Sequence, residues 1–275
     1  MIGICTDSNS QMPVELARRY GIEVVPLTIT VDEVDYLEGV DIDADEFYSR
    51  YTNGHRPVVG TSQPSPGQFA VAYEDLLARG CTEILSIHVT ASASGTINAA
   101  RLAAHSVPTP VRLVDSGTAS FGISCCVWAA AEAIAYGATL DEAAQIAEQL
   151  APKIRNVFVV GALDHLHRNG RGADVQHDEG TAVLTMRDGK VEVVTRAGTV
   201  VEVVNAMATV AIACGDRLRV AVGHSDWETA PIADALEAAI GEAANVIDVV
   251  RYRVGPSIGA HTGPGTVGCF MFPAG

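Results

Sequence analysis

The first half of this 275-residue chain alternates short apolar runs with longer amphipathic stretches, and this alternation limits the fold more than any other feature of the sequence. Such a pattern is typical of parallel strands that are joined by crossover helices. The expected strands are Ile2 to Thr6, Glu23 to Thr30, Glu83 to His88 and Val111 to Asp115. We therefore expect an N-terminal α/β domain in which helices flank a parallel sheet.

Capping boxes mark the starts of the expected helices in this half of the chain. In each box, a capping side chain pairs with an acid or amide three residues later. The pairs are Asp43 with Glu46, Ser65 with Gln68 and Thr139 with Glu142. Pro66 suits the first position of a helix, because the backbone N–H that proline lacks would have no helical partner there.

Beyond Pro152 the alternation gives way to a pattern of mixed strands and helices. Asp188-Gly189 favours a tight hairpin turn between strands at 183–187 and 191–195. The other expected elements are strands at 157–160, 218–223 and 246–252 and helices at 201–213 and 227–240. We place a domain boundary near residues 150–157, which gives an N-terminal domain of residues 1–154 and a C-terminal mixed α/β domain of residues 155–275.

The formal net charge of −15, from 18 basic and 33 acidic residues, argues against one class of partner. Such a field repels phosphate backbones, so no nucleic acid is expected to bind. The chain has no polybasic cluster that would attract it to an anionic membrane, so we expect at most transient contact with a membrane. Met1 leads directly into the first expected strand without room for a signal peptide, so we expect a cytoplasmic protein.

The sequence predicts neither a metal site nor a bound cofactor. The six cysteines lack metal-ligand spacing, and His165, His167 and His177 have no carboxylate partner spaced for one helix face. No phosphate-binding P-loop is present. Any phosphoryl transfer would therefore need a nucleotide that another protein brings.

Two hydroxyl-rich segments, residues 61–66 and 92–96, stand at the expected starts of helices. Ligands of open parallel sheets collect at the carboxyl ends of the strands, where loops and helix N-termini converge. Thr61, Ser62 and Ser94 could bind an anion there, because the free amides of a helix N-terminus favour negative charge. Each segment alone is typical of a plain helix cap, and only their combination indicates a site.

A distant glycine-rich stretch, residues 255–266, surrounds His261 and is too poor in packing side chains to be core. Its glycines, among them Gly263, suit turns that need positive φ. We expect this loop to hold His261 beside a bound ligand, while Asp7 and Asp115 support loops at the strand ends. Alone, His261 is equally consistent with an ordinary loop histidine, but with the hydroxyl segments it predicts a site for a small anionic group.

The order of these motifs resembles that of DegV-family proteins over nearly the whole chain. The shared segments are residues 6–8, 36–42, 61–66 and 94–96, Gly170-Arg171 and the His261 loop. The resemblance is specific for the Thr-Ser-Gln-Pro, Ser-Gly-Thr and His-Thr-Gly-Pro-Gly elements taken together. It implies a two-domain DegV-like α/β fold, with an N-terminal parallel sheet flanked by helices and a C-terminal mixed α/β domain.

The resemblance also implies a carrier rather than an enzyme. DegV-like proteins enclose a long-chain fatty acid in a tunnel between the domains, as the binding subunit of bacterial fatty-acid kinase in phospholipid metabolism. A separate ATP-binding kinase subunit phosphorylates the bound acid to an acyl phosphate. By their places in the motifs, the residues implied to bind the carboxylate are Thr61, Ser62, Ser94 and His261. Those implied to support the loops are Asp7, Gly95, Thr96 and Gly263, and Arg171 is implied to face the kinase.

This chain departs from the family pattern around Arg171. Members commonly carry Gly-Gly-Arg and then a strand with Lys-Pro, where this chain has Asn169-Gly170-Arg171 and then residues 181–186, Thr-Ala-Val-Leu-Thr-Met. The departure bears on the kinase-facing role of Arg171 and on the tunnel wall of the C-terminal domain. It lies away from the carboxylate contacts.

Two other functions stay open from the sequence. Ser94 and His261, with Asp115 or Asp7, could form a serine-hydrolase triad, because geometry rather than chain order defines a triad. Against this, Ser94 lacks the Gly-x-Ser-x-Gly turn that exposes the nucleophile in many α/β hydrolases. A lipid sensor without a transfer role would need the same ligand site as a carrier, so the sequence does not separate these two functions.

Overall fold

The computed structural model describes residues 1–52, 55–161, 180–187 and 189–274, which form two compact units. The first unit comprises residues 1–43, 54–153 and 255–260, and the second comprises residues 44–53, 154–254 and 261–275. Residues 44–53 and 255–260 therefore belong to a different unit from the residues on either side of them. The division into folding domains of residues 1–154 and 155–275 stays a prediction.

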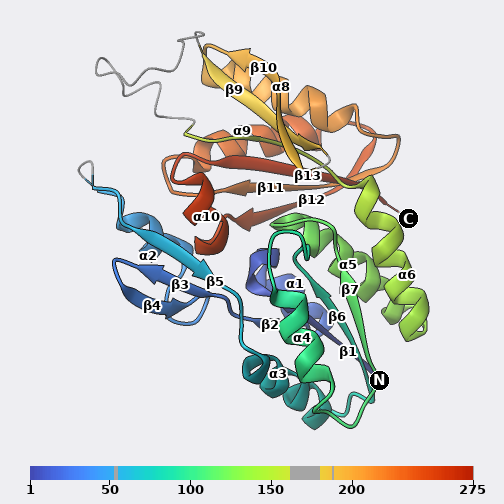
Figure 1. The fold of residues 1–275 in the computed structure, drawn as a ribbon. Helices are drawn as coiled ribbons and strands as arrows, with labels where there is room; N and C mark the ends of the chain where they lie inside the picture. Colours follow the sequence, from blue (N-terminus) through green and yellow to red (C-terminus); the bar gives the residue numbers. More distant parts are fainter. Residues whose placement is uncertain (53–54, 162–179, 188, 275) are drawn as a thin grey trace. The chain divides into compact units, whose positions relative to one another are not determined.

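A four-stranded parallel sheet in the order β2-β1-β6-β7 forms the centre of the first unit (Figure 1). Its strands are β1 (Ile2–Asp7), β2 (Glu23–Val25), β6 (Glu83–His88) and β7 (Val111–Asp115). β1 and β6 are buried along almost their whole length, as expected for parallel strands that are covered on both faces. The predicted N-terminal parallel sheet is confirmed.

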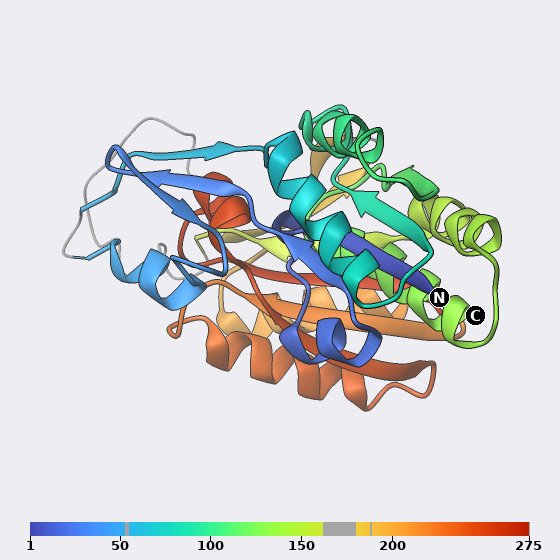
Figure 2. The same ribbon diagram turned by 90° about the horizontal axis from the view of Figure 1, so that it is seen from below.

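Helices cover this sheet in two pairs (Figures 1 and 2). α3 (Pro66–Ala78) packs with α4 (Thr96–Ala104) on one face, and α5 (Phe121–Ala135) packs with α6 (Leu140–Leu150) on the other. α1 (Val14–Tyr20) follows β1, and a short 3-10 helix, η2 (Ala151–Lys153), follows α6. The aromatic rings of α3 are fully buried against strand residues, and burial of each such side chain contributes about 1.5–3 kcal/mol.

The capping boxes predicted for α3 and α6 are confirmed. The Ser65 hydroxyl accepts the Gln68 N–H at 3.3 Å, and the Ser65 N–H donates to the Gln68 side chain at 2.9 Å. Thr139 and Glu142 form the same reciprocal pair, at 3.4 and 2.8 Å. Pro66 occupies the first position of α3, as predicted.

The expectation of one strand over residues 23–30 is wrong. The chain leaves the parallel sheet after Val25, and β3 (Thr28–Val31) enters a separate antiparallel sheet with β4 (Val34–Leu37) and β5 (Val59–Ser62). Pro26 lies at the break, where proline has no N–H to donate to a strand ladder. This second sheet places Thr61 opposite Ile29, directly before α3.

A six-stranded mixed sheet in the order β10-β9-β8-β13-β11-β12 forms the centre of the second unit. Its strands are β8 (Arg155–Val159), β9 (Thr181–Arg187), β10 (Lys190–Ala197), β11 (Leu218–His224), β12 (Val246–Arg253) and β13 (Val267–Pro273). β11 and β12 are parallel, and the other neighbours are antiparallel. The predicted mixed α/β character of this part is confirmed, although β13 was not expected.

α8 (Val200–Ile212) and α9 (Ala230–Gly241) pack together on one face of the six-stranded sheet (Figure 2). Their apolar residues form one buried core with β8, β11 and β13. The expected start of α9 at Trp227 is wrong, because the helix begins at Ala230 and the Trp227 side chain is exposed. α2 (Ala44–Ser49) also belongs to this unit. No helix in the described ranges is both long and apolar enough to cross a membrane.

Candidate functional site

A buried hydrogen-bond network joins the carboxyl ends of β1 and β6. One carboxylate oxygen of Asp7, Oδ2, accepts from His88 Nδ1 at 2.9 Å and from the Val89 N–H at 3.1 Å. Its other oxygen accepts the Asn9 N–H at 3.1 Å, at the start of the 3-10 helix η1 (Ser8–Ser10). Asp7 and His88 are fully buried. Asp7 therefore fixes two loops at the edge of the parallel sheet where the sequence predicts a site.

The same network continues from His88 into the core. His88 Nε2 lies 2.6 Å from the Ser86 hydroxyl, which lies 2.9 Å from the Tyr73 hydroxyl. Nδ1 of His88 therefore faces the Asp7 carboxylate, and Nε2 faces the Ser86 hydroxyl. The series resembles a Ser-His-Asp triad, but Ser86 is fully buried, so no substrate reaches it. Burial also raises the pKa of Tyr73, as expected for a core hydroxyl.

The Ser94-Gly95-Thr96 segment lies at the start of α4 and after the end of β6. The Ser94 hydroxyl accepts the Thr96 N–H at 3.3 Å and lies 2.8 Å from the Thr96 hydroxyl. Thr96 is buried and Ser94 is half-buried. Asp115, at the end of β7, accepts the Ala91 N–H at 3.1 Å and so fixes the loop that leads to Ser94.

The two predicted hydroxyl segments meet at Gly95. A Cβ atom added to Gly95 would overlap Oε1 of Gln63 and would lie 2.9 Å from its Cδ, so the Gln63 amide covers this glycine directly. Gln63 follows Thr61 and Ser62, of which Thr61 is half-buried and Ser62 is exposed. Gln63 was not among the predicted site residues. The signal in the sequence was the glycine of the Ser-Gly-Thr element, which leaves room for a neighbouring side chain.

A buried carboxylate, Glu38, directly follows β4 and was also missed as a site residue. It accepts the Ser8 hydroxyl at 2.5 Å and the Ser257 N–H at 2.8 Å. Burial raises the pKa of Glu38, and the hydrogen bonds from Ser257 and Ser8 partly offset this effect. The Ser8 hydroxyl also accepts the Leu27 N–H at 2.9 Å, which ties the cluster to the segment before β3.

His261 lies in a helix rather than in the expected glycine-rich loop, so that expectation is wrong. α10 (Pro256–Thr262) begins with proline at a position that needs no N–H, and His261 is exposed in its last turn. The glycines follow the helix: Gly263 and Gly265 have φ of +70° and +80°, which other residues rarely adopt. Gly263 therefore ends the helix that carries His261.

The structure brings some of the predicted site residues together. Asp7, Ser94, Gly95 and Thr96 lie at the carboxyl ends of β1 and β6, and the Thr61 segment reaches Gly95 through Gln63. All of these belong to the first unit, whereas His261 and Gly263 belong to the second. Arg171, His165, His167 and His177 lie outside the described residues. Within those residues, no group of three or more His, Cys, Asp or Glu side chains could hold a metal ion.

The two aspartates that could complete a serine-hydrolase triad hold loops at the ends of their strands. Asp7 is the partner of His88, and both of its oxygens accept from the backbone. Asp115 uses both of its oxygens on the N–H groups of Ala91 and Gly117, at 3.1 and 2.9 Å. Asp7 therefore already has a histidine partner other than His261, and Asp115 fixes the turn after β7.

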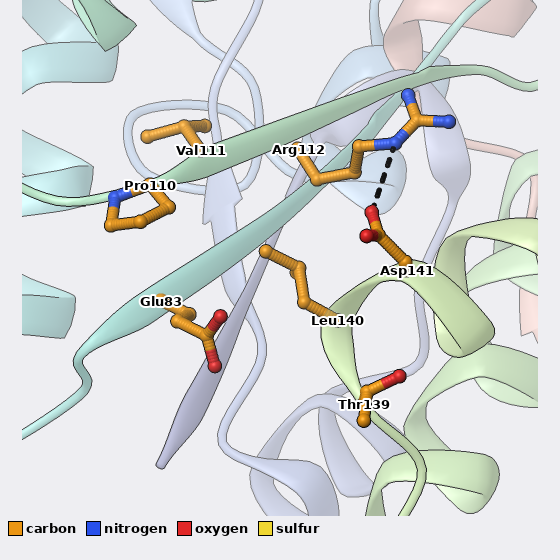
Figure 3. Close-up of a pocket in the computed structure, with 7 residues that line it drawn as sticks. All are labelled: Glu83, Pro110, Val111, Arg112, Thr139, Leu140 and Asp141. Carbon is orange, nitrogen blue, oxygen red and sulfur yellow. Dashed lines mark ion pairs between the residues drawn. The ribbon is translucent and has the colours of Figure 1, made fainter.

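A pocket of about 340 Å³ lies at the opposite, amino ends of β6 and β7 (Figure 3). Residues from the starts of these strands and of α6 line it: Glu83, Pro110, Val111, Arg112, Thr139, Leu140 and Asp141. The Arg112 guanidinium lies 3.8 Å from Asp141 and donates to Glu148 at 2.7 Å, so its charge is already compensated. No predicted site residue lines this pocket, and we do not assign it a function.

Comparison with known proteins identifies the family. The family described as "Uncharacterised protein, DegV family" matches residues 1–274. A DegV domain-containing protein of Streptomyces coelicolor is 34% identical over 97% of this chain and 96% of its own length. Another, from Caldanaerobacter subterraneus, is 32% identical over 98% of both chains.

Solved structures agree in fold. A DegV family protein from Thermus thermophilus, described by its fatty-acid binding, matches with a TM-score of 0.82 and 29% identity over 99% of both chains. A DegV lipid binding protein from Thermotoga maritima matches with a TM-score of 0.81 and 25% identity over 98% of both chains. The match over residues 1–274, together with relatives above 30% identity along nearly their whole length, shows that this chain belongs to the DegV family.

Proposed function

We propose that this protein binds a long-chain fatty acid and holds its carboxylate with Thr61, Ser62, Ser94 and His261. The observation that carries the proposal is the contact of Gln63 with Gly95, which joins the two hydroxyl segments at one edge of the first unit. The Thermus and Thermotoga relatives, described as binding fatty acid and lipid, support the same ligand class.

The chemistry of the segments suits a carboxylate. A fatty acid is ionised at neutral pH, and hydroxyl and N–H donors bind it through charge-assisted hydrogen bonds without a fixed cation. Thr61 is half-buried and Ser62 is exposed, and each carries a hydroxyl that can donate to a carboxylate. These residues also precede α3, whose N-terminus favours a nearby negative charge.

The acyl chain supplies most of the affinity in this proposal. Each buried methylene contributes about 0.8 kcal/mol, so a long chain outweighs the head-group contacts. The DegV resemblance implies a tunnel between the domains for this chain. The head group then sets orientation, because it is the only polar part of the ligand.

We further propose that the bound acid is presented to a separate ATP-dependent kinase. In such a step, a carboxylate oxygen attacks the γ-phosphorus of ATP, the bond to the β-phosphate oxygen breaks, and acyl phosphate and ADP form. The chain has no P-loop, so the nucleotide would be brought by the partner. Arg171 is the residue that the family resemblance places toward that partner.

The first experiment extracts purified protein with organic solvent and identifies released acids by mass spectrometry. The protein is then delipidated and titrated with oleate and with methyl oleate. Thr61→Ala and Ser94→Ala should each weaken oleate binding by about ten-fold or more, because a charge-assisted hydrogen bond is lost. Methyl oleate should bind more weakly than oleate, because its uncharged ester cannot accept charge-assisted hydrogen bonds from the hydroxyls.

The controls for this experiment lie in the same loop. Ser92→Ala removes an exposed hydroxyl next to Ser94 and should leave the affinity unchanged. Gly95→Ala should weaken binding while leaving stability nearly intact, because the new methyl displaces only the end of the Gln63 side chain. Unchanged oleate affinity in Thr61→Ala, Ser94→Ala and Gly95→Ala would show that the carboxylate binds at another place.

A second experiment tests the transfer step with the fatty-acid kinase subunit of the same genome and ATP. Wild-type protein should support acyl-phosphate formation, and Arg171→Ala should retain bound acid but lose the transfer. Binding of acid without any transfer would support a lipid sensor instead. Hydrolysis of an ester substrate that Ser94→Ala abolishes would support a hydrolase.

A further inference from the structure

The start of α10 is held by side chains from the N-terminal part of the first unit. The Ser257 N–H donates to Glu38 at 2.8 Å, and the Gly255 N–H donates to the side-chain oxygen of Gln11. Pro256, between them, has no N–H. These contacts give side-chain partners to N–H groups that a helix start leaves free, so Glu38 and Gln11 act as caps from a distant part of the chain.

The cap is built from more than one hydrogen bond. The Ser257 hydroxyl accepts from the side-chain amides of Asn9 and Gln11, at 3.4 and 3.2 Å. Ser8, next to Asn9, donates to the second oxygen of Glu38. Glu38 is buried, and its two oxygens accept from one backbone N–H and one hydroxyl, those of Ser257 and Ser8.

The turn after α10 is held separately, by residues of the second unit. The Gly265 N–H donates to Asp226 at 2.7 Å, and the Thr266 N–H donates to the Ser225 hydroxyl at 2.9 Å. His261 lies in the last turn of α10, between these two fixed points and four residues after Ser257. The direction of its side chain therefore depends on how both ends of a helix of seven residues are held.

The geometry points to Glu38 as a positioning residue: by accepting the Ser257 N–H, it fixes the start of α10 and so sets where His261 meets a bound carboxylate. This inference rests on the proposed function, in which His261 binds the acid. Glu38 does not touch the ligand in this role. It acts through the helix that carries the histidine.

The first test follows α10 in the ligand-free protein by hydrogen exchange. Glu38→Ala should speed amide exchange at Ser257 and in the rest of α10 by about ten-fold or more, because the Ser257 N–H loses its side-chain acceptor. Glu38→Gln keeps a carbonyl oxygen in the same place and should restore most of the protection. Glu74→Ala, which removes an exposed carboxylate from α3, is the matched control and should change nothing in α10.

The second test is a double-mutant cycle on oleate affinity. Glu38→Ala should weaken binding by about ten-fold in the wild-type background and by less than about two-fold in the His261→Ala background, because the effect passes through His261. Rescue by Glu38→Gln should appear only when His261 is present. If Glu38→Ala does not fold, Glu38→Gln is carried through the same cycle, and its smaller loss should also vanish without His261.

The outcomes separate this inference from the proposed function. An equal loss in both backgrounds, or unchanged exchange of α10 in Glu38→Ala, would overturn the role of Glu38 whether or not the protein binds fatty acid. Faster exchange of α10 in a protein that binds no fatty acid would instead overturn the proposed function and keep the cap. Faster exchange together with a loss of affinity that depends on His261 supports both.

Discussion

His224 is a buried imidazole at the end of β11, with 7% of its surface exposed and two arginines as neighbours. Burial, with the charges of Arg253 and Arg251, lowers the pKa of His224 to about 4, although Asp226 and Asp234 oppose the shift. An Arg251 N–H lies 3.2 Å from Nδ1, which is consistent with a neutral ring that accepts at this atom. In the unfolded chain this histidine has a pKa of 6.5, and in the folded chain its pKa is about 4. As the pH falls from 6.5 toward 4, the unfolded chain therefore binds a proton that the folded chain does not bind, and the free energy of unfolding decreases.

We expect His224→Gln to reduce this acid sensitivity. Between about pH 7 and pH 4, the histidine should remove roughly 2–4 kcal/mol from the free energy of unfolding, a loss that glutamine cannot cause. Urea unfolding at several pH values, compared between the two proteins, measures the difference. His105→Gln replaces an exposed histidine and should leave the pH profile as in wild type. Parallel profiles for wild type and His224→Gln would contradict the assignment.

For single residues, the sequence predicts a role in the site only where the adjacent residues in the chain indicate that role. Thr61 and Ser94 are recognisable because hydroxyls cluster before helix starts. Gln63 and Glu38 are not, because their roles come from distant partners: Gly95 for Gln63, and Ser257, 219 positions away, for Glu38. A glutamate at the end of an exposed strand looks solvated until the chain that buries it is known.

Elements with local signals were predicted well, and those with tertiary causes were not. The capping boxes place the starts of α3 and α6 correctly, because a cap depends only on residues within one turn. The break at Pro26 was missed, since an apolar run on both sides resembles one strand. α10 was taken for a loop, because its seven residues lie between glycines at 255, 263 and 265, and so short a helix depends on the caps from Gln11 and Glu38.

The cap of α6 allows a direct test at the scale of one element. Thr139→Ala should lower the free energy of unfolding by about 1 kcal/mol, because the Glu142 N–H loses its acceptor and the Glu142 carboxylate loses one of its two donors from Thr139. The backbone N–H and the hydroxyl of Thr139 both lower the pKa of Glu142, so loss of the hydroxyl should raise this pKa part of the way back. Urea unfolding measures the first effect and carboxyl NMR titration the second. Thr139→Ser keeps the hydroxyl and should restore both, whereas an unstable Thr139→Ser variant would point to packing of the methyl group instead.

For the whole molecule, the sequence indicates two α/β parts but not how the chain is shared between them. The change of pattern near residue 152 is visible because strand and helix spacing changes there. The sequence does not show that residues 44–53 and 255–260 belong to a different unit from their neighbours in the chain. Their assignment depends on contacts between distant residues, such as Arg253 with Asp45 and Ser257 with Glu38. Short segments that cross between units carry no periodicity of their own.

The excess of acidic residues determines how the stability of the whole molecule should respond to salt. With 33 acidic and 18 basic residues, the net charge is −15. Folding brings these charges closer together, and their mutual repulsion destabilises the folded state. Exposed pairs such as Arg79 with Glu23 and Arg50 with Glu46 oppose it, but each contributes only about 0–1 kcal/mol. Raising sodium chloride from about 10 to 150 mM shortens the screening length from about 30 to 8 Å.

We therefore expect the melting temperature to rise over this salt range, because screening weakens the many repulsions more than the few attractions. Differential scanning calorimetry of delipidated protein measures it at pH 7.5 to 8, well above the pKa of about 4 of His224. A second series at equal osmolality with sucrose separates screening from a general solute effect. A melting temperature that falls with salt would mean that local ion pairs, rather than the net charge, dominate the electrostatic part of stability.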